Sequence, residues 1–586
     1  MLKRFFISVL GTMTGLWLSV AVLFFCGMIM IGYSIGKAGD SAVKVEKRSI
    51  LYFNLAGEIS ERATSQPFLQ LIQNIDSESM TLEDMLRSLR RAADDDRIEG
   101  LYIKCDGSAM GTASREELVQ AIDSFKTSGK WVVAYGDTYT QGDYLIASTA
   151  DELYLNPVGA IDIHGVGGMT PFFKGLLDKV GVKMQIIKVG TFKSAVEPYV
   201  LTSMSEPARL QMQQYCDSLW SYIAGTIADN SGMPADSVHI LAPQMIGTRQ
   251  ASFFVEAGLA DELLYEREVD NHLRDLTDLS ADDDLRLVTP ADYLAANSSS
   301  LSFSSDKKHI AVYYAAGDIV DSGSEGIVGM TVVDDIVSLA DDKNVAGLVF
   351  RVNSPGGSAF ASEQIWEALQ YFKSKHKPLY VSMGDYAASG GYYISCGADS
   401  IFADRTTLTG SIGVFGMIPD LSGLVTDKLG VNFSVVETNP NANGINLTKA
   451  MTPEQHAAMQ KSVENIYELF TSRVAEGRHM PQDSVKAIAE GRVWTGGRAI
   501  ELGLVDRLGS LRETVVAMAD RLGMKTSETV AYPVIDENVW EKILRESGGL
   551  EMEAPLDKET LEYLYFVKRL REMNPMQARM EELVIE

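Results

Sequence analysis

The chain contains an internal repeat, and this repeat constrains the fold more than any other feature. The run "ILYFNLAGEI" from Ile50 matches "IAVYYAAGDI" from Ile310, and "GLYIKCDG" from Gly100 matches "GLVFRVNS" from Gly347. In both copies the apolar, strand-like runs alternate with segments of helical periodicity. This order predicts α/β domains built from right-handed crossover units, repeated in tandem.

The repeat also sets the predicted domain boundaries. One copy covers residues 46–265 and the other covers 309–530. Residues 266–308 are rich in Asp and Ser, which predicts a polar linker. Residues 531–586 mix charged and apolar side chains, and we expect a mostly helical tail.

The beginning of the chain is apolar. No charged residue lies between Phe5 and Tyr33, and roughly 20 apolar residues cross a bilayer as a helix. We therefore expect residues 1–45 to form a membrane anchor. A cleaved signal peptide is the alternative, but the apolar run is longer than usual for one and no convincing A-x-A site follows it. Lys and Arg residues lie on both sides of the run, so charge alone leaves the orientation open.

Composition excludes several kinds of partner. A formal net charge of −27 argues against a nucleic-acid partner, which requires clustered Lys and Arg. The four cysteines form no C-x-x-C pair and no cluster with histidine. We therefore expect no metal site and no cofactor.

The two copies differ at a position that could carry chemistry. The second copy reads "GDYAASGGYYIS" over 384–395, and the first reads "GDTYTQGDYLIA" over 136–147, so Gln141 stands where the second copy has Ser389. A serine at a tight turn between strand and helix exposes its hydroxyl, and the amide of Gly390 would lie at the helix N-terminus, where donors lack partners. A turn of this kind can also serve packing alone.

A second segment, "NSPGGS" over 353–358, follows an apolar run of the second copy. Pro355 restricts the backbone and the glycines relax it, so the N–H of Gly357 can point away from a sheet partner. Together with the Gly390 amide it would form a two-donor oxyanion hole. The first copy reads "CDGSAMG" here, so the fold itself does not require the Pro-Gly-Gly turn.

A serine nucleophile needs a base. None of the seven histidines lies in these two segments, so a Ser-His-Asp triad is not expected. Lys193 in "KVGTFKSAVEPYV" is the remaining candidate, and a lysine serves as a base only when it is neutral. The aligned position of the second copy is about Ala442. The nucleophile would thus come from one copy and the base from the other, and the two copies must face each other.

The motifs "SPGG", "ASGGYY", "TGSIGV" and "FKSAVEP", in these halves, make the chain resemble the signal peptide peptidase A family in its long, duplicated form. The resemblance extends from the apolar run to about residue 525. It implies a fold similar to ClpP and the crotonases and a Ser/Lys dyad. It makes Ser389 the nucleophile and Lys193 the general base, with Gly357 and Gly390 as oxyanion donors and Ser411 holding the lysine amine.

The resemblance further implies a serine peptidase that cleaves remnant signal peptides and other apolar peptides. It implies a homotetramer anchored by a single span in the inner (cytoplasmic) membrane, with the catalytic domains outside the cytoplasm. Two alternatives remain at this stage. A crotonase-like acyl-thioester enzyme would need carboxylates near the oxyanion hole and would leave Lys193 without a role. A non-catalytic membrane scaffold would not explain why serine and lysine each occur in one copy only.

Overall fold

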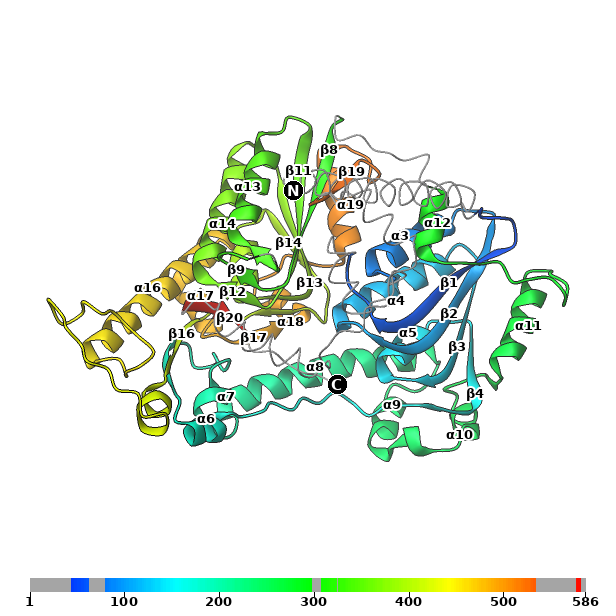
Figure 1. The fold of residues 1–586 in the computed structure, drawn as a ribbon. Coiled ribbons are helices and arrows are strands. Elements are labelled where there is room, and N and C mark those ends of the chain that lie inside the picture. Colours follow the sequence, from blue (N-terminus) through cyan, green and yellow to red (C-terminus); the bar gives the residue numbers. More distant parts are fainter. Residues whose placement is uncertain (1–43, 63–79, 298–306, 324, 534–575, 581–586) are drawn as a thin grey trace, which may run out of the picture.

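The computed structural model describes residues 44–62, 80–297, 307–323, 325–533 and 576–580. We call residues up to 297 the first half and residues from 307 to 533 the second half. Figure 1 shows the two halves as neighbouring α/β units, each built around a twisted sheet. The predicted anchor run from Phe5 to Tyr33 lies outside the described residues. Within the described ranges, no helix is long and apolar enough to cross a membrane.

The first half is built on a six-stranded sheet with the order β6-β4-β3-β2-β1-β7, whose neighbours pair in parallel. Its strands are β1 (Ser49–Glu58), β2 (Ile98–Ala109), β3 (Trp131–Tyr139), β4 (Glu152–Ile161), β6 (Glu262–Leu263) and β7 (Leu287–Val288). The crossover helices are α3 (Leu82–Ala92), α4 (Thr112–Lys126) and α5 (Gln141–Ala147).

The second half repeats this order as β18-β14-β13-β11-β8-β19, with β15 and β17 extending the sheet beyond the end of β13. Its strands are β8 (His309–Ala316), β11 (Val345–Ser354), β13 (Leu379–Ala388), β14 (Ser400–Ala403), β15 (Leu408–Gly410), β17 (Val493–Thr495), β18 (Arg507–Leu508) and β19 (Thr529–Tyr532). The helices between them are α13 (Gly329–Asp341), α14 (Ala359–Ser374) and α15 (Gly390–Ser395). The internal repeat of the sequence is therefore a repeat of topology.

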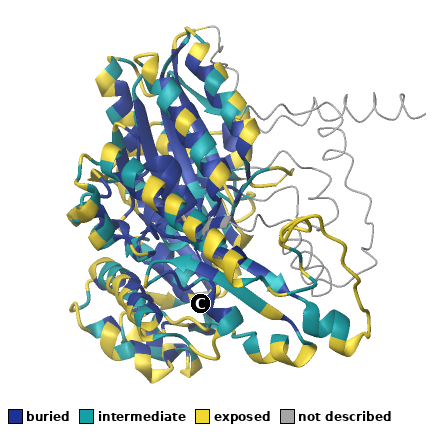
Figure 2. Cartoon of the chain, turned by 90° about the vertical axis from the view of Figure 1, so that its left-hand side faces the viewer, coloured by how far each residue is buried: buried dark blue, intermediate teal, exposed yellow. Residues whose placement is uncertain are grey.

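The central strands read as nearly continuous apolar runs because helices or loops cover both faces of each sheet. In β11, the run from Gly347 to Val352 is entirely buried. Each half packs its own large apolar cluster, one beginning at Val45 and the other containing Phe350 and Tyr392. Figure 2 shows the buried residues concentrated in the strands of the second half and the exposed ones on the outer faces of the helices.

A third sheet joins the halves. Its order is β10-β9-β12-β20-β16-β5. Its strands are β5 (Lys183–Val189), β9 (Ile319–Val320), β10 (Ile327–Val328), β12 (Gly356–Ser358), β16 (Val414–Asp420) and β20 (Met576–Arg579). Strand β5 leaves the first half to pair antiparallel with β16 of the second half. This pairing carries the chain that follows β5 into the second half.

Two segments differ from what their composition suggested. Within 266–308, expected to be a linker, α11 (Glu266–Leu276) and α12 (Pro290–Ala296) flank β7, which pairs with β1. Apolar residues such as Leu273 and Tyr293 are buried at helical spacing among the Asp residues, so these helices complete the first half. In the tail, expected to be helical, residues 576–579 instead form strand β20, and residues 534–575 lie outside the described part.

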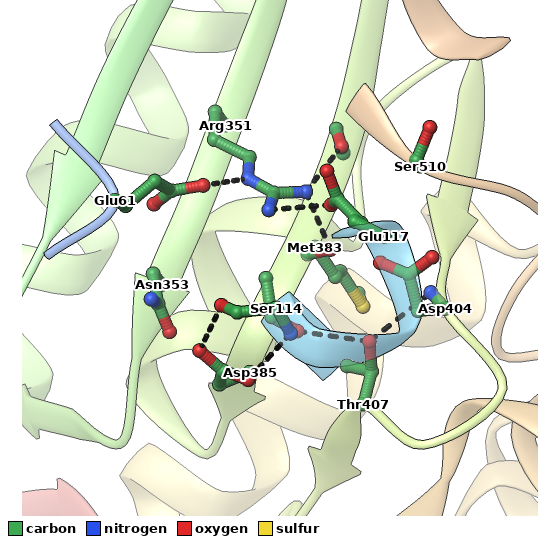
Figure 3. Close-up of polar contacts among 12 residues, drawn as sticks. Glu61, Ser114, Glu117, Arg351, Asn353, Met383, Asp385, Asp404, Thr407 and Ser510 are labelled. Atoms are coloured by element: carbon green, nitrogen blue, oxygen red, sulfur yellow. Dashed lines mark hydrogen bonds and ion pairs between the residues drawn. The ribbon is translucent and has the colours of Figure 1, made fainter. Parts of the chain in front are cut away.

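Buried charges hold the halves together (Figure 3). Arg351 on β11 is 1% exposed and pairs with Glu61 and with Glu117 of α4, the latter at 2.7 Å between Nη2 and Oε1. Burial raises the pKa of Glu61, and Arg351 opposes this shift. Asp404 lies beside Glu117, and burial followed by the repulsion of Glu117 raises the pKa of Asp404 well above its ordinary value. Breaking such a pair leaves a buried charge uncompensated, which is costly. The contact therefore fixes the position of one half relative to the other.

Candidate active site

Ser389 lies at the turn where β13 ends and α15 begins. Its backbone has φ 56° and ψ −113°, in a region that residues with a side chain rarely occupy. The turn is held because Ser389 N donates to Gly410 O at 2.8 Å. The residue at Gly391 must be small, since a Cβ there would lie 2.5 Å from the carbonyl oxygen of Ser354. The strained turn thus presents a serine side chain at the end of the sheet, where the third sheet begins.

Lys193 reaches this serine from the first half. Its Nζ donates to Ser389 Oγ at 2.8 Å, to Ser411 Oγ at 3.0 Å and to Ser411 O at 3.1 Å. Lys193 is 1% exposed and Ser389 is fully buried. The amine is therefore held between two hydroxyls and a carbonyl, at hydrogen-bond distance from the oxygen that would attack.

The loop that carries Lys193 is fixed by residues that the motifs did not reveal. Gln211 on α8 (Glu206–Asn230) donates to Phe192 O at 3.0 Å and to Ser194 Oγ at 2.9 Å. On the other side Gly491 packs directly on Lys193, where a Cβ would lie 2.7 Å from the Cβ of the lysine. No local signal in the sequence identifies these supports, because they come from distant segments that meet only in the fold.

The contact between the two halves near Ser389 also involves the N-terminus of α4. Ser114 N and Ser114 Oγ donate to the two carboxylate oxygens of Asp385, at 3.0 and 2.6 Å. Asp385 belongs to β13, the strand that ends at Ser389 (Figure 3). A carboxylate is stabilised at a helix N-terminus. This contact therefore ties the first half to the strand that carries the candidate nucleophile.

The candidate oxyanion donors come from α15 and from β12, two elements that contact each other. Gly390 is the first residue of α15, where amides have no acceptor within the helix. Gly357 lies in β12 with φ 155°, and a Cβ there would lie 2.0 Å from Ile319 O. Only glycine fits this backbone position. The structure therefore brings all five sequence-predicted residues, Ser389, Lys193, Ser411, Gly357 and Gly390, to one region.

The C-terminal strand β20 runs along the same region. It pairs antiparallel with β12, with Gly357 opposite Ala578, and on its other side with β16. Just past its end, Met580 N donates to Pro355 O at 3.0 Å. Arg579 and Met580 also line a small cavity next to Lys193. An extended segment of the chain's own tail thus lies against the strand that carries a candidate oxyanion amide.

The side chains of Cys396 and Gln141 do not compete for the chemistry. Cys396 follows α15 and is fully buried, and burial raises the pKa of its thiol to about 12, so it stays protonated at neutral pH. In the first half, Gln141 takes the position of Ser389. Its Oε1 accepts from His164 N and Gly165 N at 3.1 and 2.9 Å. The side chain of Gln141 is therefore used to hold a loop.

Known proteins resemble this chain over most of its length. The model of peptidase family S49 matches residues 124–280 and 371–525, and the Clp protease model matches 320–410. The chain is 33% identical to Protease 4 of Haemophilus influenzae over 87% of this chain and 85% of that protein. It is 28% identical to the chloroplastic serine protease SPPA of Arabidopsis thaliana over 83% of this chain and 71% of that protein. It is 32% identical to a putative signal peptide peptidase SppA of Enterococcus faecium over 38% of this chain and 67% of that protein.

Proposed function

Because this chain belongs to peptidase family S49 and is a serine peptidase, we propose that Ser389 and Lys193 form its catalytic dyad. The observation that carries the proposal is the 2.8 Å contact between Lys193 Nζ and Ser389 Oγ, made by buried residues from opposite halves. Membership of the family sets aside both the acyl-thioester enzyme and the non-catalytic scaffold.

The proposed reaction begins with a neutral Lys193. Its amine accepts the proton of Ser389 as Oγ attacks the carbonyl carbon of the scissile peptide bond. The N–H groups of Gly357 and Gly390 donate to the resulting oxyanion. The lysine then passes its proton to the leaving amine, the peptide bond breaks, and an ester remains on Ser389. Water attacks this ester and Lys193 accepts the water proton. The bond between the acyl carbon and Ser389 Oγ then breaks, Lys193 returns the proton to Oγ, and the acid product leaves.

Ser411 has a positioning role in this proposal. Its hydroxyl and carbonyl both accept from Lys193, so they aim the amine at Ser389. Ser411 itself has φ 50°, and its N–H donates to Arg492 O at 2.7 Å. The backbone that holds the amine is therefore itself fixed from a neighbouring loop.

Substrates, in the same proposal, are peptides that bind as extended strands. The edge of β12 supports this mode, because a stretch of the tail already pairs there as β20. An added strand receives its main-chain hydrogen bonds from the sheet edge. Remnant signal peptides and other apolar peptides are the proposed class, supported by the resemblance to signal peptide peptidases.

The location and assembly belong to the proposal as well. The uncharged run from Phe5 to Tyr33 supports a single-pass anchor in the inner (cytoplasmic) membrane. The resemblance supports catalytic domains outside the cytoplasm and a homotetramer.

A fluorophosphonate probe tests the dyad. It should label the full-length chain at Ser389, located by mass spectrometry of the modified peptide, and Lys193→Ala should abolish labelling. Lys183→Ala, on the exposed end of β5, is the matched control and should label normally. Labelling of another serine, or normal labelling of Lys193→Ala, would refute the assignment.

A further inference from the structure

We propose that Gln211 is a positioning residue for the dyad, whose side-chain amide joins the loop of Lys193 to the strand that supports Ser389. The amide would thereby set the distance between the amine and the hydroxyl. This inference rests on the proposed function, because it gives Gln211 a task in the reaction of the same site. It is carried by the contacts of one buried side chain and by the way α8 spans both halves.

The amide of Gln211 uses all of its hydrogen-bonding groups. Its Nε2 donates to Phe192 O at 3.0 Å and to Ser194 Oγ at 2.9 Å, and its Oε1 accepts from Val493 N at 3.3 Å. The side chain is 3% exposed. Turning the amide over would set its oxygen against Phe192 O and its N–H groups against Val493 N. The backbone therefore fixes its orientation, and the amide holds both neighbours of Lys193.

The strand at the other end of this bridge supports Ser389. Val493 lies in β17 and pairs with Gly410 of β15. Gly410 O accepts from Ser389 N at 2.8 Å, and the next residue is Ser411, whose hydroxyl and carbonyl accept from Lys193. The amide therefore connects the loop of the base, through one strand pair, to the backbone beside both hydroxyls that contact the amine.

Helix α8 holds the amide in place relative to both halves. Ile223 and Ile227, toward its C-terminus, belong to the apolar cluster of the first half. Met212 and Leu219, closer to its N-terminus, pack in a second cluster that includes Val493. Figure 1 shows α8 running below both halves, from one to the other. Because the helix is anchored at both ends, the amide is a fixed point for the loop.

Other contacts keep this loop folded without the amide. Phe192 N donates to Glu490 O at 2.9 Å, and the carboxylate of Glu197 accepts from Ser205 N and Oγ at 3.0 and 2.6 Å. Loss of the amide would leave the loop attached, but two acceptors beside Lys193 would lose their donor. A misplacement of about 1 Å at a reacting group can cost ~10²-fold in rate. The amide therefore acts on alignment rather than on folding.

Charged side chains from neighbouring segments also lie near the loop. Lys188 Nζ donates to Lys193 O at 3.4 Å, and the guanidinium of Arg492 lies 4.8 Å from the centre of the phenylalanine ring that precedes Lys193. Arg579 lines the same small cavity as Lys193. Replacing Gln211 by a neutral residue changes none of these charges. A change in the pH profile of such a variant would therefore come from the placement of the amine.

Gln211→Met tests the role, because methionine has a similar length and lacks the amide donors and acceptor. In the full-length chain, kcat for a short apolar ester, divided by the fraction of sites that a fluorophosphonate probe titrates, should fall ~10²-fold. KM should change by less than about two-fold. The matched control is Gln213→Met on the exposed face of α8, where the side chain donates to Asp217 at 2.8 Å. The control should keep both kcat and KM.

The pH profile separates alignment from stability. In Gln211→Met the rising limb of kcat/KM should move to higher pH by about one unit, because water that enters the loosened loop stabilises the charged amine. A variant that is only less stable would keep the limb of the wild type, since the sites that remain folded are unchanged. The control Gln213→Met should show the limb of the wild type.

A second variant serves if Gln211→Met does not fold. Gln211→Glu has nearly the same shape, and its carboxylate can accept from Val493 N but cannot donate to Phe192 O. Measured on the alkaline side, where the carboxyl group is ionised, it should lower kcat per titrated site ~10-fold or more with KM nearly unchanged.

The proposal is overturned if kcat per titrated site in the Gln211 variants stays within about two-fold of wild type, or if the whole loss appears as a higher KM. An unmoved limb in Gln211→Met, or an equal loss in Gln213→Met, would also overturn it. Failure of the dyad is read separately, from normal labelling of Lys193→Ala. An inactive Lys193→Ala beside an unaffected Gln211→Met would refute only the role of the amide.

Discussion

Lys193 donates a 2.8 Å hydrogen bond to Ser389 although 196 residues separate them in the chain. The contact exists because β5 crosses from the first half to pair with β16. One chain therefore contains a complete candidate dyad, and the relation between its halves controls the distance on which the chemistry depends.

Removing either member of the dyad should abolish most of the activity. Ser389→Ala and Lys193→Ala should each lower kcat by ~10⁴-fold or more, because neither residue of a catalytic dyad can carry out the reaction without the other. Circular dichroism and the Tm should show that both variants stay folded. Gln141→Ala, which alters the corresponding position of the first half, should keep kcat. Normal kcat in Lys193→Ala would contradict the dyad, as would loss of kcat in Gln141→Ala.

The pH profile should report a lysine base. The active form is the neutral amine, so kcat/KM for a short apolar ester should rise with pH above neutrality and reach a plateau on the alkaline side. Ser411→Ala should lower the rate less than Lys193→Ala, because it removes one of the acceptors that orient the amine. A rising limb near the ordinary histidine value of about 6.5 that survives in Lys193→Ala would refute the assignment.

The buried carboxylate of Asp404 should make stability depend on pH. Burial raises its pKa well above the ordinary value, so its contribution to folding is present in acid and is lost as pH rises through the folded-state pKa. Asp404→Asn should therefore gain stability relative to wild type as pH increases from about 5 to about 9, measured by urea unfolding. A constant difference for Asp404→Asn would contradict the shift.

The tail strand should compete with substrate. Because β20 pairs with β12 opposite Gly357, a peptide can use that edge only when β20 leaves it. Deleting residues 576–586 should lower KM for a peptide substrate several-fold and leave kcat nearly unchanged. The reason is that a larger fraction of the enzyme molecules then has the β12 edge free to bind substrate. Adding the peptide MQARM should inhibit the shortened enzyme, and a scrambled peptide should inhibit it less. An unchanged or higher KM would argue that β20 is only structural.

The first residues should be dispensable for catalysis. Val45 is 5% exposed and belongs to the apolar cluster of the first half, so the cut is best placed after residue 43. A chain that begins at Lys44 should be soluble without detergent and should hydrolyse the short ester at the full-length rate. Loss of ester hydrolysis in a folded, soluble chain would show that the apolar run contributes to the site.

Much of the fold could be inferred from local patterns. Apolar runs such as the one from Gly347 to Phe350 indicate strands buried on both faces, and the repeated order of elements predicts the two α/β units. The unusual turn at Ser389 could be located because small residues follow it. The regions that were harder to predict were those whose stability comes from distant partners. The helices of 266–297 depend on a few buried residues within an acidic stretch, and β20 is a strand only because β12 and β16 lie on either side of it.

The sequence by itself determined the duplicated architecture through local periodicity, and differences between the two aligned copies pointed to Ser389 and Lys193. The role of Ser411 came from the resemblance to the family. The sequence placed serine in one copy and lysine in the other. Only the tertiary structure decided that Lys193 meets Ser389 within one chain, that Gln211 and Gly491 hold its loop, and that Arg351 joins the halves. Buried ion pairs and the pairing of edge strands both depend on contacts between residues that are far apart in the chain. The free energy of those contacts has no local signature in the sequence.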